Sequence, residues 1–155
     1  MNAVTPDSFF GRVGGVYCAA TRQIDRLQPL LLLAFRLYVA RVFFMSGLTK
    51  IHDWSVTVAL FTNEYHVPVL PPGIAALMGT AAELSMPLLL AFGLATRFGA
   101  FILLFFNIIA VVSFAALPDI AVKDHLLWGV LILVVLVFGP GKISLDYWLE
   151  GRRPR

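Results

Sequence analysis

Three polar residues lie deep inside long apolar runs of this sequence: Arg41, Glu83 and Asn107. An arginine at the centre of a membrane helix costs roughly 2.5 to 3.5 kcal/mol on insertion scales, so a cation at that depth indicates a functional site and needs a partner. Glu83 is the acidic residue inside a later apolar run, which makes it the predicted partner of Arg41. Counting along the runs places all three near the membrane midplane, where Asn107 could satisfy the leftover donors and acceptors.

This predicted group supports two interpretations. In the first, the Arg41–Glu83 pair only locks two helices together. In the second, the group forms a polar midplane pocket that binds the headgroup of a quinone or a similar small molecule and moves a proton, with Glu83 and Arg41 as the candidate catalytic residues. A further arginine, Arg36, lies nearer the start of its apolar run and is predicted to reach the headgroups as an anchor.

Polar and aromatic residues also gather outside the apolar runs. Trp54 and Tyr65 precede a proline-rich stretch and could form an aromatic wall at the mouth of the pocket. The histidines and several carboxylates map to this same side, and imidazole with carboxylate suits copper or zinc. Their spacing matches no standard ligand motif, so a metal site remains an alternative that rests on three residues: His52, His66 and His125.

The composition places the chain in lipid. It has 155 residues, of which 59% are hydrophobic and 14% charged, with a mean hydropathy of +0.85. A soluble protein of this size usually has about 25% charged residues. The net charge of +3 is small and its basic residues form no groove-lining pattern, which argues against a nucleic-acid partner. A single cysteine, Cys18, excludes an internal disulfide and a CxxC relay.

Four runs are long enough to cross a bilayer, so we expect an all-α, four-helix transmembrane bundle. A basic amphipathic stretch before them predicts a separate helix lying flat in the membrane interface, and helical spacing from Trp54 to Tyr65 predicts a short surface helix. The predicted units are an N-terminal segment over 1–29, a membrane domain over 30–149 and a basic tail over 150–155. The predicted spans cover 30–50, 73–94, 98–117 and, from 124 or 125, up to 138.

Lysine and arginine are concentrated in the N-terminal segment, the turn at 95–97 and the tail. The positive-inside rule then predicts that both termini are cytoplasmic and that the loops over 51–71 and 118–124 lie outside. Small residues on helix faces permit a homodimer without requiring it.

Several motifs occur together and in order: RLYVARVFFMSGLTKI, then FTNEYHVPVLPP, then AALMGTAAELSMPLLLAFGLATRFGA, and finally KDHLLWGVLILVVLVFGPGKISLDYWL. Over roughly residues 30 to 149 the chain resembles the DoxX family of small bacterial four-helix membrane proteins. The resemblance implies a location in the bacterial cytoplasmic membrane and an association with oxidoreductases, because a relative, DoxD, is similar to a subunit of a thiosulfate:quinone oxidoreductase. The positions that match recurring polar residues of the family are Arg41, Ser46, Lys50, Glu83 and Arg97.

We therefore hypothesise that the protein is a membrane subunit of a redox system and works with a redox partner protein. The cofactor that this hypothesis suggests is a quinone, bound in the midplane pocket. A non-catalytic scaffold or assembly partner for a redox enzyme is the alternative from another class, and a metal-handling protein is the third. The substrate-binding residues predicted for the pocket are Arg41, Ser46, Lys50, Trp54, Tyr65, Glu83 and Asn107.

Overall fold

The computed structural model describes residues 9–65, 67, 69–114 and 117–151. Within these ranges the regular structure is helical, with an isolated bridge between Tyr65 and Phe114, which confirms the predicted all-α class. The helices are α1 (Phe9–His52), α2 (Trp54–Asn63), α3 (Pro72–Phe92), α4 (Thr96–Ser113), α5 (Asp119–Phe138) and α6 (Leu145–Glu150).

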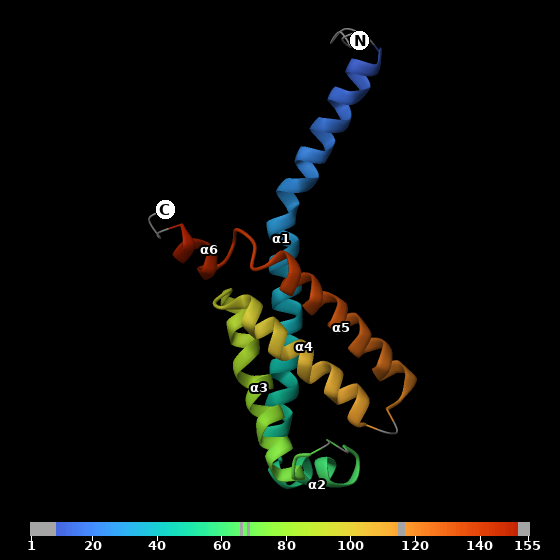
Figure 1. The fold of residues 1–155 in the computed structure, drawn as a ribbon, viewed down its shortest axis with the longest axis vertical. Helices are drawn as coiled ribbons and strands as arrows, with labels where there is room; N and C mark the ends of the chain where they lie inside the picture. The colour runs from blue at the N-terminus through green and yellow to red at the C-terminus, as the bar shows by residue number, and fades with distance from the viewer. Residues whose placement is uncertain (1–8, 66, 68, 115–116, 152–155) are drawn as a thin grey trace.

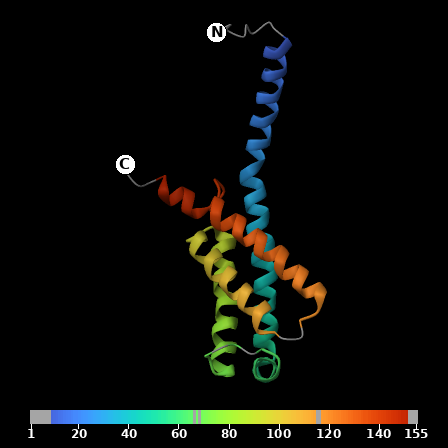
Figure 2. The same cartoon turned by 45° about the vertical axis from the view of Figure 1, so that its right-hand side comes forward.

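Four of these helices, α1, α3, α4 and α5, are long and apolar enough to cross a membrane. The chain is therefore a multi-pass membrane protein, as the hydropathy predicts. The first half of α1 projects from the bundle, α2 lies across the opposite end, and α6 returns to the end from which α1 projects (Figures 1 and 2). We call these two ends the α2 end and the α6 end.

The four long helices form a ring around one apolar core. Helix α1 packs against α3 and α5, and α4 lies between α3 and α5. The core is built from Val39 of α1, Leu90 of α3, Leu103 of α4 and Ile132 of α5, all of which are fully buried. Many large apolar side chains remain on the outside, as expected where the surrounding solvent is hydrocarbon.

Helix α1 runs without a break through Pro29, which is inside it. The sequence predicts that a new helix begins at this proline. That helix boundary is wrong, and the separate interfacial helix before it is not confirmed. A proline removes one backbone donor, but the neighbouring turns keep their own hydrogen bonds and can carry the helix past it. The N-terminal half therefore continues along the direction of the first span (Figure 1).

The predicted short helix after the first span is confirmed as α2. Asp53 caps its N-terminus, accepting a hydrogen bond from the backbone N–H of Val56 at 3.0 Å and one from the Ser55 hydroxyl at 2.7 Å. These two hydrogen bonds lower the pKa of the Asp53 carboxyl below its usual value, and the bond from Val56 has the larger effect. The cap separates α2 from α1 and turns the chain across the α2 end of the bundle.

The start of α5 and the presence of a sixth helix, both toward the C-terminus, differ from the sequence prediction. Helix α5 begins at Asp119, ahead of the predicted start, because Pro118 ends the extended connection and an acidic residue favours the first turn of a helix. The short helix α6 is not foreseen at all. Ser144 caps it by accepting a hydrogen bond from Tyr147 N at 3.1 Å.

Arg36 is buried at the α6 end, with 1% of its surface exposed. Its Nε and Nη2 atoms donate to the carbonyls of Leu90 (2.8 Å) and Ala91 (3.1 Å) in the last turn of α3. Its Nη1 atom donates to the carbonyls of Pro140 (2.6 Å) and Ile143 (2.8 Å) after α5. The prediction that Arg36 is a headgroup anchor is therefore wrong: carbonyls freed at the end of a helix offer a guanidinium a fixed set of acceptors inside the protein.

The turn between α3 and α4 is held by α6. Asp146 accepts hydrogen bonds from Ala95 N (2.8 Å), Thr96 N (2.9 Å) and the Thr96 hydroxyl (2.9 Å), so a distant residue caps the start of α4. Gly93 ends α3 with a φ of +68°, and a Cβ there would lie 2.6 Å from Arg36 Nη2. Both the left-handed backbone and the approach of Arg36 require glycine at this position.

Candidate functional site

A pocket of about 360 Å³ lies toward the α2 end, between the end of α1, α2, the connection to α3, and the facing sides of α3 and α4. Its volume is within the range typical of small-molecule sites, and its lining is mostly apolar with a few polar groups. The lining residues are Lys50, Phe61, Tyr65, Val67, Leu70, Ala75, Met78, Gly79, Glu83, Phe105, Phe106, Ile109 and Ala110.

The polar part of this pocket is an ion pair between Lys50 of α1 and Glu83 of α3. Lys50 Nζ lies 2.5 Å from Glu83 Oε2, and the two side chains are only 15% and 17% exposed. The sequence pairs Glu83 with Arg41, and this pairing is wrong. Lys50 is nearer the α2 end than Arg41, and the packing of α1 on α3 brings its ammonium group to the carboxylate.

The close packing of α1 on α3 explains how the pair forms. A Cβ atom on Gly47 would lie 2.9 Å from the Leu84 side chain and 3.2 Å from the backbone carbon of Glu83. The glycine therefore lets the two helix backbones approach closely one turn before Lys50. If the two helices lay farther apart, Lys50 and Glu83 would each be buried without an opposite charge, which is unfavourable in a low-dielectric setting.

Ser46 and Tyr65 complete the polar surroundings of the pair. Lys50 Nζ also donates to Ser46 Oγ at 2.9 Å, so the serine one turn earlier fixes the direction of the lysine side chain. Tyr65 stacks on Phe61 with ring centroids 4.8 Å apart and packs edge-on against Phe114 at 4.9 Å. Burial, and to a lesser extent the Glu83 carboxylate, raises the pKa of the Tyr65 phenol above its usual value.

This arrangement can bind a molecule with a flat apolar body and a carbonyl or hydroxyl group. The aromatic and aliphatic lining would contact the body, while Lys50 could donate to an oxygen and Glu83 could accept from a hydroxyl. Both charged side chains are largely buried, so such a ligand would meet them away from bulk solvent.

The other residues predicted for the pocket, two of them at the midplane and one at its mouth, lie elsewhere. Arg41 is exposed on the outer surface of α1 and lines no part of the pocket. Asn107 is buried between α4 and α5, where its Nδ2 donates to the His125 carbonyl at 3.0 Å and its Oδ1 lies 2.8 Å from His125 Nδ1. Trp54 begins α2 and does not line the pocket. Helix rotation separates these residues, and sequence depth alone cannot show it.

The candidate metal ligands are not brought together within the described chain. His125 is held by Asn107, and His52 is exposed at the end of α1. His66 falls outside the described residues. Among the residues that the structure does describe, no three His, Cys, Asp or Glu side chains are grouped closely enough to hold a metal ion.

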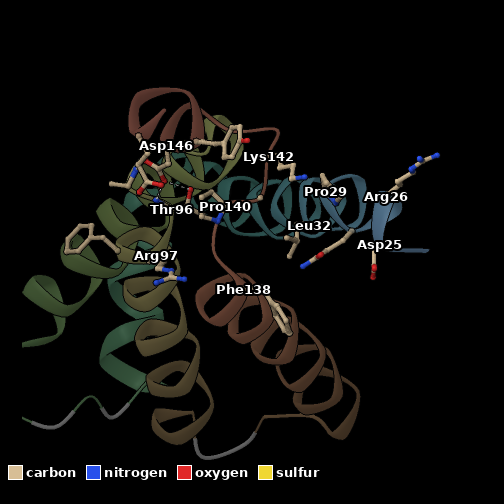
Figure 3. A pocket seen from close by; sticks show the side chains of 16 residues that line it. Asp25, Arg26, Pro29, Leu32, Thr96, Arg97, Phe138, Pro140, Lys142 and Asp146 are labelled. Carbon is tan, nitrogen blue, oxygen red and sulfur yellow. Dashed lines mark hydrogen bonds between the residues drawn. The ribbon is translucent and has the colours of Figure 1, made fainter. Parts of the chain in front are cut away.

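A larger and more open pocket of about 1200 Å³ lies at the α6 end (Figure 3). Charges of both signs line it, among them Arg26, Arg97, Lys142 and Glu150. Asp146 also lines it, but its carboxylate is used to cap α4. These groups line an interfacial cleft, whereas the smaller pocket combines apolar walls with a shielded ion pair.

Sequence reasoning missed the apolar wall of the smaller pocket, to which Phe61, Met78 and Phe106 contribute. One signal was present: Phe61 belongs to the helical spacing that predicts α2.

The family model that describes the DoxX domain matches residues 31–116, more than half of the chain. The chain belongs to the DoxX family. An uncharacterized protein of Haemophilus influenzae is 32% identical to this DoxX protein over 124 residues, which cover 74% of the chain and 80% of the relative. No solved structure matches the chain described here. The matched range contains α2, α3, α4 and the part of α1 within the bundle, and so includes both Lys50 and Glu83.

Proposed function

We propose that this DoxX protein is a membrane subunit of a redox system and binds a quinone in the pocket beside Lys50 and Glu83. The observation that supports this is a shielded ion pair at the wall of an otherwise apolar pocket within a membrane bundle. A quinone has a flat ring with two carbonyl oxygens and an apolar tail, so it needs an apolar slot with a few hydrogen-bonding groups.

In this proposal Lys50 donates a hydrogen bond to a ring carbonyl and Ser46 keeps the ammonium group in place. Glu83 accepts a hydrogen bond from a hydroxyl of the reduced form. Tyr65 and Phe61 contact the ring or the first part of the tail. Arg41 and Asn107 lie outside the pocket and are not among its proposed binding residues.

The proposed location is the bacterial cytoplasmic membrane, with both termini in the cytoplasm. The distribution of lysine and arginine supports this orientation, because α1 begins at the α6 end with its arginines and the basic tail follows α6. The quinone pocket would then lie in the outer half of the membrane. The electron donor would be a redox partner protein.

The test is binding of a ubiquinone or menaquinone analogue to the purified full-length protein, compared with Glu83→Gln and Lys50→Met. We expect saturable binding to the wild type and a loss of about tenfold or more in affinity for each variant, since each removes a charge-assisted hydrogen bond. Glu150→Gln is the matched control, because Glu150 is an exposed glutamate at the α6 end. It should bind like the wild type.

Thermal unfolding of the same variants separates binding from stability. If neither the wild type nor the variants bind an analogue, and Glu83→Gln merely melts earlier, the ion pair is a helix lock and the quinone proposal is rejected. The scaffold alternative would then be the better description of the protein.

A further inference from the structure

Arg41 is exposed on the surface of α1 that the ring of helices leaves uncovered. It lies between Arg36, which is held at the α6 end, and Lys50, which is held toward the α2 end. In the part of the chain that the structure describes, Arg41 makes no hydrogen bond and no ion pair. A guanidinium at this depth would face hydrocarbon, which is unfavourable, and arginines inside membranes are almost always paired.

The surface around Arg41 is apolar and continuous along α1. Leu37, Tyr38 and Met45 flank it at helical spacing, with 48%, 46% and 52% of their surfaces exposed. These side chains and Arg41 form one stripe, the α1 stripe, because residues three and four apart share a helix face. A stripe of this kind resembles the contact face of a membrane helix with one charge at its centre.

Among the described residues, no carboxylate could meet Arg41 from a second copy. Glu83 is the described acid nearest the middle of a span, and Lys50 holds it. The remaining described acids lie near helix ends, in connections or in the projecting half of α1: Asp25, Asp53, Glu64, Asp119, Asp124, Asp146 and Glu150. Two copies joined through the α1 stripe would place like charges together, which disfavours that dimer.

We infer that the α1 stripe binds a transmembrane helix of a different protein that carries an aspartate or glutamate at the depth of Arg41. The apolar residues of the stripe would pack against that helix, and Arg41 would form a bidentate pair with its carboxylate. Such a pair fixes both the partner and its vertical register in the membrane. This inference does not depend on what the pocket beside Lys50 binds.

The test is site-specific photo-crosslinking of the full-length protein in its own cell membrane, with benzoylphenylalanine at Met45. Leu133, which is 48% exposed on α5, is the control position at a surface outside the stripe. We expect a crosslink from Met45, but not from Leu133, to a membrane segment that contains an aspartate or glutamate. Arg41→Leu should reduce the yield roughly tenfold or more.

A charge swap decides whether the carboxylate is the partner. Arg41→Glu should abolish the crosslink, and changing the partner's carboxylate to arginine should restore it. Crosslinks only to a second copy or only to lipid would overturn the inference. A crosslinked partner segment without a carboxylate, or a crosslinking yield that is unchanged in Arg41→Leu, would also overturn it. The purified Arg41→Leu protein should melt no earlier than the wild type, and an earlier melt would assign Arg41 a role inside its own chain instead.

Discussion

Two arginines on one helix have different surroundings in this protein. Arg36 points into the bundle and donates to four backbone carbonyls from two parts of the chain, whereas Arg41 points outward and has no partner among the described residues. Five residues separate them, which places them on different faces of α1, so the rotation of α1 decides which one enters the bundle. A guanidinium suits the first position because its fork can reach α3 and the segment after α5 at the same time.

Arg36→Lys should destabilise the protein markedly. A lysine ammonium is a single point and cannot satisfy carbonyls on both sides, so at least one buried acceptor loses its partner. We expect a loss of about 3 kcal/mol in the free energy of unfolding, measured by denaturant titration in a mild detergent. Arg41→Lys is the matched control and should unfold like the wild type. Equal stability of both variants would mean that the carbonyls around Arg36 find other donors.

At the scale of helices, the site depends on how closely α1 and α3 approach. Gly47 permits the contact with Leu84, and the same approach brings Lys50 to Glu83. The ion pair is therefore a consequence of helix packing as well as of charge. Helix α2 and the connection after it then cover the pair with Phe61 and Tyr65.

Gly47→Ala should lower both stability and ligand binding. The new methyl group must displace the Leu84 side chain or separate the helices, and overpacking of this kind typically costs about 1 to 3 kcal/mol. Denaturant titration and quinone-analogue binding would measure the two effects. Gly15→Ala is the control, since nothing lies within 4 Å of the added Cβ, and it should keep or slightly raise stability. A Gly47→Ala protein with wild-type binding would show that the pocket tolerates a wider helix separation.

At the scale of the whole molecule, the chain enters and leaves the bundle at one end. Helix α1 begins beyond the α6 end, α6 returns there, and α2 lies at the other end (Figure 2). Four crossings require this arrangement, and the basic residues assign the α6 end to the cytoplasm. Cys18 is the single cysteine of the sequence and is exposed on the projecting half of α1. Labelling of this thiol can therefore show on which side of the membrane the α6 end lies.

A membrane-impermeant maleimide should label Cys18 in inverted membrane vesicles but not in intact spheroplasts. The reverse pattern is expected for Asn63→Cys in a Cys18→Ser background, because Asn63 is exposed at the end of α2. Labelling yield, measured by mass shift on a gel, gives the orientation directly. Labelling of Cys18 from outside would invert the proposed topology and would place the quinone pocket in the inner half of the membrane.

Much of the architecture could be predicted from the sequence. Apolar runs predicted four spans, helical spacing predicted α2, and the co-occurring motifs predicted the DoxX family, all of which are confirmed. The predicted helix boundary at Pro29 was wrong, because the neighbouring turns continue α1 past that proline. The predicted start of the last span at 124 or 125 was late, because α5 begins at Asp119, directly after Pro118. The helix α6 was missed because a six-residue segment has too little periodicity to detect.

The candidate site shows where sequence reasoning stops. The residue types and their depth were visible from hydropathy, because the cost of placing a charge in hydrocarbon acts on every residue of a span. Which charge meets which was decided only by the tertiary structure: helix rotation and the contact at Gly47 paired Glu83 with Lys50 and left Arg41 outside. The sequence by itself determined that this is a four-span membrane protein, because burial in lipid depends on composition along the chain. The partners of its charges depend on distances between helices, which only packing sets.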